Sequence, residues 1–169
     1  MRLMPIFAFA LLTGCTQSSS APTTPTTQAV TVEDAHDHDH DRAKMKVAHL
    51  GKHHAWLTAH LSSKDGHELD IFMEEMNAPK PVALPVNTLR GKATKAGDVK
   101  EYALTFEPAP ASERPAGEAA GRCSHYVAKT PWLTPDDEWT VVIEVELEGR
   151  NRKAAWKNFT PKTFAHHEE

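Results

Sequence analysis

Hydrophobic alternation between residues 139 and 148 constrains the fold of this 169-residue chain more than any other feature. Successive side chains of a β-strand point to opposite faces, so apolar residues at every second position create one apolar face. The two interleaved sets are Trp139, Val141, Ile143, Val145 and Leu147 on one side, and Thr140, Val142, Glu144, Glu146 and Glu148 on the other. This pattern predicts a strand with one buried face and one mainly acidic face.

The same period of two occurs twice in the first half of the chain. Residues 55–61 and 69–73 each place apolar side chains at alternate positions. Between them stands Ser63-Lys64-Asp65-Gly66, a turn signal between two alternating runs. These segments predict a β-hairpin whose two strands bury the same face.

Shorter extended segments complete an all-β prediction. Residues 102–106, 123–127 and 154–159 have extended patterns, and Pro and Gly interrupt the chain between them. Seven or eight short strands without a convincing helix indicate an antiparallel β-sandwich of about immunoglobulin size, with a small β-barrel as the alternative. The domain is expected to cover residues 46–163, and residues 164–169 are expected to form an exposed His/Glu tail.

The first fifteen residues have the layout of a bacterial export signal. Arg2 precedes an apolar run of about ten residues, which is too short to cross a hydrocarbon core of about 30 Å as a helix. The run ends in Leu12-Thr13-Gly14-Cys15, which resembles the lipobox of bacterial lipoproteins. That resemblance implies that residues 1–14 are removed and that a lipidated Cys15 anchors the protein to a membrane of the cell envelope. An ordinary secretory signal with an incidental cysteine is the alternative.

Sorting between the two envelope membranes is implied by the same resemblance. In bacterial lipoproteins an aspartate after the lipidated cysteine favours retention in the inner membrane. Here that residue is Thr16, which favours the outer membrane.

A polar segment, residues 15–45, is expected to separate the anchor from the domain. Its first part is rich in Ser, Thr and Pro without large apolar side chains, which predicts a disordered tether. It also contains His36-Asp37-His38-Asp39-His40-Asp41. Imidazoles bind Zn, Cu and Ni, and a disordered chain can bend so that two of His36, His38 and His40 reach one ion. The alternative is a solvated acidic spacer whose histidines bind nothing.

A second candidate metal site lies within the predicted domain. Cys123 and His125 are two residues apart in an expected strand, so their side chains are predicted to leave the same face. A thiolate and an imidazole at that spacing can share one Zn or Cu(I) ion, with His53, His54 or His49 as further ligands. The single Cys-x-His pair favours the alternative, a buried cysteine beside a surface histidine. If Cys15 carries lipid, Cys123 has no disulfide partner.

Composition and motifs narrow the function classes. A formal net charge of −4 provides no basic field for nucleic acid. Signatures of metalloproteases, serine hydrolases, phosphate loops and dinucleotide sites are absent from the sequence, so no enzymatic activity and no organic cofactor are expected.

Two function classes remain. With eleven histidines, the chain loosely resembles, in composition alone, the His-rich envelope proteins that accompany heavy-metal efflux systems. The resemblance implies a lipoprotein that sequesters or hands over transition-metal ions, with an efflux protein as partner. The alternative is a structural or interaction lipoprotein that uses a sheet face to bind an envelope partner.

Overall fold

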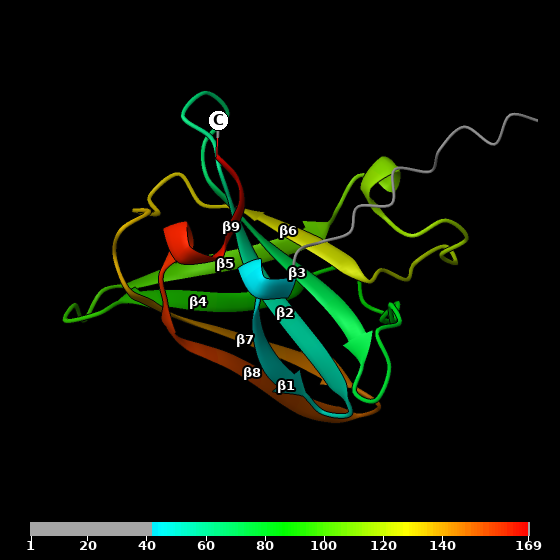
Figure 1. Cartoon of the computed structure of the whole chain (residues 1–169). Helices are drawn as coiled ribbons and strands as arrows, with labels where there is room; N and C mark the ends of the chain where they lie inside the picture. Colours follow the sequence, from blue (N-terminus) through cyan, green and yellow to red (C-terminus); the bar gives the residue numbers. More distant parts are fainter. Residues whose placement is uncertain (1–41, 169) are drawn as a thin grey trace, which may run out of the picture. The chain divides into compact units, whose positions relative to one another are not determined.

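Nine β-strands make up the folded part of the chain, of which the computed structural model describes residues 42–168 (Figure 1). Three short 3-10 helices, η1 Arg42–Lys44, η2 Ala111–Glu113 and η3 Pro161–Phe164, accompany them, and no α-helix occurs in this range. The all-β prediction is therefore confirmed. The strands are β1 Lys46–Leu50, β2 His53–Leu61, β3 Glu68–Glu75, β4 Leu89–Lys95, β5 Glu101–Pro108, β6 His125–Lys129, β7 Trp139–Leu147, β8 Arg150–Phe159 and β9 Ala165–Glu168.

The strands follow one path around a single core. Neighbours pair in the order β1-β2-β3-β6-β5-β4-β7-β8, and each of these pairs is antiparallel. β5 pairs with β4 through residues 101–106 and with β6 through Glu107 and Pro108, so it joins the two halves of the sheet. The ends of the path, β1 and β8, lie side by side, and Lys46 Nζ donates to the carbonyl oxygen of Asn158 at 2.6 Å. The result is a nearly closed, barrel-like sheet.

The core comes from the apolar positions of the alternating segments. Leu57, Leu69, Ile71, Leu104, Phe106, Val141 and Ile143 are buried, and Tyr102 and Val145 pack half-buried against them. Large aromatic side chains fill the rest of the interior, among them Trp139, Trp156, Tyr126 and Phe159. Burying one large aliphatic side chain contributes about 1.5–3 kcal/mol, so these alternating faces supply the main driving force for folding.

β4 is a strand that the hydrophobic pattern did not reveal. After Leu89 its side chains are small, charged or hydroxylic, so no apolar alternation marks it. It pairs on both sides, with β5 and with β7. Gly91 allows the close approach of β7, because a Cβ atom there would lie 2.2 Å from the carbonyl oxygen of Val142.

The C-terminal segment forms a strand, so the exposed tail predicted for residues 164–169 is wrong for its described part. η3 leads into β9, which pairs in parallel with β2. Phe164 stacks on Phe159 with ring centroids 5.4 Å apart, and Ala165 is buried. Residues of β9 pair with a strand about a hundred positions earlier, and a short polar sequence carries no signal of such a distant partner.

Candidate functional site

Histidines gather on the outer face of β2. Ala55, Leu57 and Ala59 belong to the core, so the residues between and beyond them face outward. These outward residues include His54 and His60. Each has an imidazole neighbour from another strand, His49 of β1 for His54 and His166 of β9 for His60.

The β1–β2 hairpin holds His49 and His54 opposite each other. The connection is Gly51-Lys52, and Gly51 has φ +65°, a value that glycine adopts without strain. His49 and His54 are direct cross-strand partners with ring centroids 5.1 Å apart. Two imidazoles that bind one tetrahedral ion at about 2.0–2.1 Å have centroids about 5 Å apart, so this spacing suits a shared metal.

Aromatic and charged side chains surround His54, the less exposed member of this pair. His49 is exposed, whereas His54 is half-buried with its ring at 6.0 Å from that of Trp56 in an edge-on arrangement. Glu74 of β3 lies opposite His54 on the other side, and its carboxylate accepts hydrogen bonds of 2.8 and 3.0 Å from Arg42. The Arg42 guanidinium also lies 5.6 Å from the Trp56 ring. Because Glu74 already binds Arg42, the imidazoles of His49 and His54 are left as the metal-binding groups among these three cross-strand neighbours.

The described residues do not contain a complete ligand set. Within residues 42–168, no group of three or more His, Cys, Asp or Glu side chains is arranged to hold an ion. The second imidazole pair, His60 and His166, has centroids 5.8 Å apart, and Nδ1 of His166 lies 3.2 Å from Thr58 Oγ1. The folded domain therefore offers pairs of imidazoles, and any further ligands must come from water or from elsewhere.

Cys123 and His125 lie on opposite sides of the sheet, so the prediction that they share a face is wrong. Cys123 pairs with Leu84 through an isolated bridge, and its side chain is 1% exposed within the core. His125 instead stacks on Phe72, with ring centroids 4.1 Å apart. Ser124 forms a bend between them, and that bend breaks the alternation on which the prediction rested.

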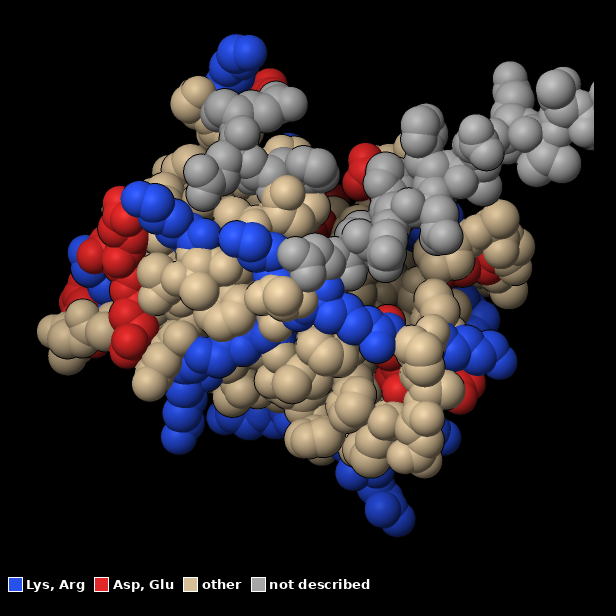
Figure 2. Space-filling view, in the orientation of Figure 1, with Lys and Arg blue, Asp and Glu red and all other residues tan. Residues whose placement is uncertain are grey.

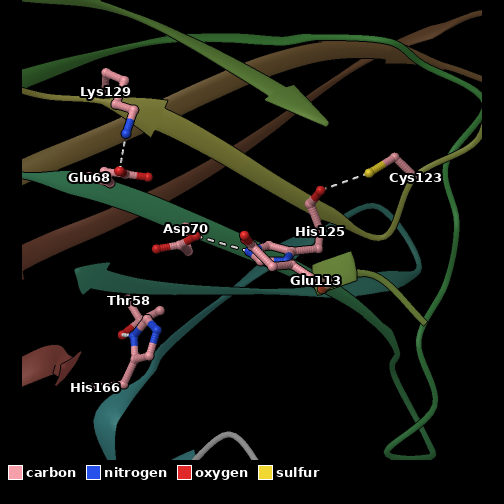
Figure 3. Close-up of polar contacts among 8 residues, drawn as sticks. All are labelled: Thr58, Glu68, Asp70, Glu113, Cys123, His125, Lys129 and His166. Carbon is pink, nitrogen blue, oxygen red and sulfur yellow. Dashed lines mark hydrogen bonds and ion pairs between the residues drawn. The ribbon is translucent and has the colours of Figure 1, made fainter. Parts of the chain in front are cut away.

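The His125 ring has an acceptor at each nitrogen (Figure 3). Nε2 lies 2.9 Å from Asp70 Oδ1, and Nδ1 lies 3.0 Å from the carbonyl oxygen of Glu113. A carbonyl oxygen only accepts, so Nδ1 donates to Glu113, and Nε2 is engaged by the Asp70 carboxyl group. Both ring nitrogens therefore have partners within the fold, and His125 fastens the β5–β6 loop to β3 instead of binding a metal.

The Cys123 thiol is also engaged within the fold. Its Sγ donates to the carbonyl oxygen of His125 at 2.7 Å, and burial raises the pKa of the thiol. The thiolate is the form that binds metals and attacks electrophiles, so a higher pKa lowers both tendencies. Cys123 is the buried free cysteine of the alternative interpretation, but its histidine neighbour is buried and not on the surface.

His53 and His54 are adjacent but face different ways. His54 lies on the outer face of the sheet beside His49, whereas His53 lines a cleft at the end of the barrel. Successive strand residues point to opposite faces, so one ion cannot be shared between them. The sequence offered His49 and His54 only as further ligands for Cys123 and His125, so their direct pairing was not predicted. Gly51, which turns the chain between them, is the sequence signal that could have revealed it.

The remaining candidate residues lie outside the described part of the chain. These are Cys15, the proposed lipidation site, and His36, His38 and His40 of the proposed tether. Their roles stay predictions.

No protein-family model, no curated protein and no solved structure matches the chain. Within residues 42–168, none of the helices has the length and apolar character to cross a membrane.

Proposed function

We propose that this protein is a lipid-anchored lipoprotein of the bacterial envelope that binds transition-metal ions through histidine side chains. The observation that carries the proposal is the pair His49 and His54, whose ring centroids lie 5.1 Å apart on an outward-facing hairpin. Imidazole pairs suit Zn(II), Cu(II) and Ni(II). The pair replaces Cys123 and His125 as the candidate site within the fold.

The sequence before the domain supports the same proposal. The segment with His36, His38 and His40 directly precedes Arg42, and Arg42 lies against Trp56 beside His54. The lipobox-like Leu12-Thr13-Gly14-Cys15 stands upstream of both. Imidazoles thus occur in the proposed tether and on the face of the domain where Arg42, the first described residue, lies.

Open sites of this kind favour exchange of the ion. A pair of imidazoles leaves coordination positions to water, and those positions allow a second protein to take over the metal. This chemistry fits sequestration or hand-over to an envelope partner such as an efflux protein better than permanent structural binding.

An interaction lipoprotein without metal is the second candidate. Val47 of β1 is 45% exposed and lies opposite Trp56, so the same sheet face carries a small apolar spot. Two neighbouring apolar side chains are a weak docking signal, since scattered apolar residues are normal on protein surfaces.

Calorimetric titration of the full chain with Zn(II) and Ni(II) tests the proposal. His54→Gln is expected to remove the stoichiometric event of the domain, because one imidazole of the pair is lost. His53→Gln is the matched control, since its ring is adjacent in sequence but faces the cleft. Deletion of residues 35–41 is expected to remove a weaker component with several sites. Isotherms unchanged in both His54→Gln and the deletion would leave the interaction module as the better function.

A further inference from the structure

A cleft of about 410 Å³ opens at one end of the barrel, and neither His49 nor His54 is among its lining residues. It lies where the β1–β2 turn, the end of β7, the start of β8 and residues 82–85 meet. Mouths of β-barrels are frequent positions for small-ligand sites, and this volume lies in the lower part of the usual range of roughly 300–1,000 Å³.

The lining of the cleft divides into an apolar part and a charged part. Val82, Pro85 and Leu147 supply accessible apolar surface, whereas Leu50 and Leu84 are 0% and 2% exposed and belong to the hydrophobic core. Charged side chains from three segments complete the lining: Lys52, Glu148, Arg122 and Arg152. A ligand that matches both parts combines an apolar body with a charged head.

The charges do not cancel within the cleft. Lys52 Nζ and Glu148 Oε1 form an ion pair at 2.5 Å, and the charge of Arg152 also acts on the Glu148 carboxylate. Arg122 donates a hydrogen bond of 2.6 Å to the neutral carbonyl of Ala83. Three cationic side chains therefore line the cleft together with one carboxylate, which gives the lining an excess of positive charge although the whole chain has a formal net charge of −4.

Lysine and arginine are also prominent at this edge of the molecule. In Figure 2 blue side chains project from the lower edge, below the region where Figure 1 labels β1 and β8. Arg152 lies over the β1–β2 turn, since its Nε is 3.4 Å from the place that a Cβ atom on Gly51 would occupy. Glycine at this turn therefore leaves room for the guanidinium.

His53 also lines the cleft, and its Nδ1 is buried without a hydrogen-bond partner. An imidazole ring in the lining is close to any group that binds in the cleft, so its resonances can report on binding.

We propose that this cleft binds a small amphiphile with an anionic head, a carboxylate or a phosphate, joined to a short apolar chain. Arg122 and Arg152 bind the head, because a guanidinium presents paired donors that match carboxylate and phosphate oxygens. Val82, Pro85 and Leu147 cover the apolar chain.

Titration of the full chain with octyl phosphate tests the site. Saturable one-to-one binding is expected, together with shifts of the His53 ring resonances in NMR spectra of the unmodified chain. Arg152→Gln and Arg122→Gln are each expected to weaken binding tenfold or more. Arg90→Gln, an exposed arginine on β4, is the matched control and should leave binding unchanged.

Simpler probes decide whether both halves of the ligand matter. Inorganic phosphate that binds as tightly as octyl phosphate would contradict the role of the apolar lining, and n-octanol that binds as tightly would contradict the role of the arginines. Arginine-dependent binding to phosphatidylglycerol vesicles without binding of octyl phosphate would assign the cleft to a membrane surface and overturn the proposal. Unshifted His53 resonances at saturating octyl phosphate would also overturn it.

Discussion

At the scale of single residues, neighbours on β7 have opposite roles. Ile143 is fully buried and packs in the core, whereas Glu144 is exposed and makes a surface ion pair of 3.4 Å with Lys153. Ile143→Ala is expected to lower the free energy of unfolding by about 2–5 kcal/mol, because it removes methyl groups and leaves a cavity. Glu144→Ala should change it by less than about 0.5 kcal/mol. Urea unfolding measures both, and equal losses would show that the faces are assigned wrongly.

His53 makes stability depend on pH. Its pKa is lowered in the folded chain, first by burial, so above the lowered value the folded state binds fewer protons at this ring than the unfolded state. Folding stability therefore decreases as pH falls from the unfolded value of about 6.5 to the lowered folded value.

Variants at two histidines test this sign. His53→Gln is expected to flatten the pH dependence of the unfolding free energy in that window, as measured by urea unfolding at several pH values. His49→Gln, which removes an exposed ring, is the comparison. A steeper loss of stability in acid for His53→Gln than for the unmodified chain would contradict the assignment.

At the scale of elements, the sequence predicted those strands whose side chains alternate. Residues 55–61, 69–73, 102–106 and 139–147 lie in β2, β3, β5 and β7. β4 was missed because its backbone pairs on both sides without an apolar face. β9 was missed because its partner β2 lies far away in the sequence.

The candidate site was predictable only in part. The histidines themselves were evident, but which of them meet depends on register. His49 and His54 meet because β1 and β2 form a tight hairpin, whereas Cys123 and His125 separate because of one bend at Ser124. A one-residue irregularity reverses the face of every following side chain, and periodicity alone does not reveal it.

Gly91 gives a test of how β4 is held. Gly91→Ala places a Cβ atom within 2.2 Å of the Val142 carbonyl oxygen, so β4 and β7 must separate. We expect a loss of at least about 2 kcal/mol in the free energy of unfolding, the scale of a severe packing defect. Lys92→Ala, on the exposed side of the same strand, should cost less than about 1 kcal/mol. A Gly91→Ala variant as stable as the unmodified chain would contradict this tight pairing.

At the scale of the whole molecule, the proposed anchor decides where the domain works. If Cys15 is lipidated, mass spectrometry of the membrane fraction should find a mature chain that begins at an acylated Cys15. Cys15→Ser should abolish the modification, while Cys123→Ser should leave it intact, since Cys123 is buried in the fold. A chain that retains Met1, or an unmodified Cys15, would exclude the lipoprotein.

The central proposal joins this anchor to metal binding by imidazole. The domain contributes the fixed pair His49 and His54, and the segment before Arg42 contributes further histidines. Binding at both places requires neutral imidazole, so it should weaken in acid. The two contributions are separable, because one is removed by deletion and the other by substitution.

Electron paramagnetic resonance of bound Cu(II) tests the central proposal most directly, because coordinated imidazole nitrogens split the copper signal. In a chain without residues 35–41, one Cu(II) with couplings from two nitrogens is expected. Replacing His49 and His54 together by Gln should abolish that signal, and His53→Gln should preserve it. A spectrum that the double substitution leaves unchanged, or the absence of bound Cu(II) in the chain without residues 35–41, would contradict metal binding by this pair.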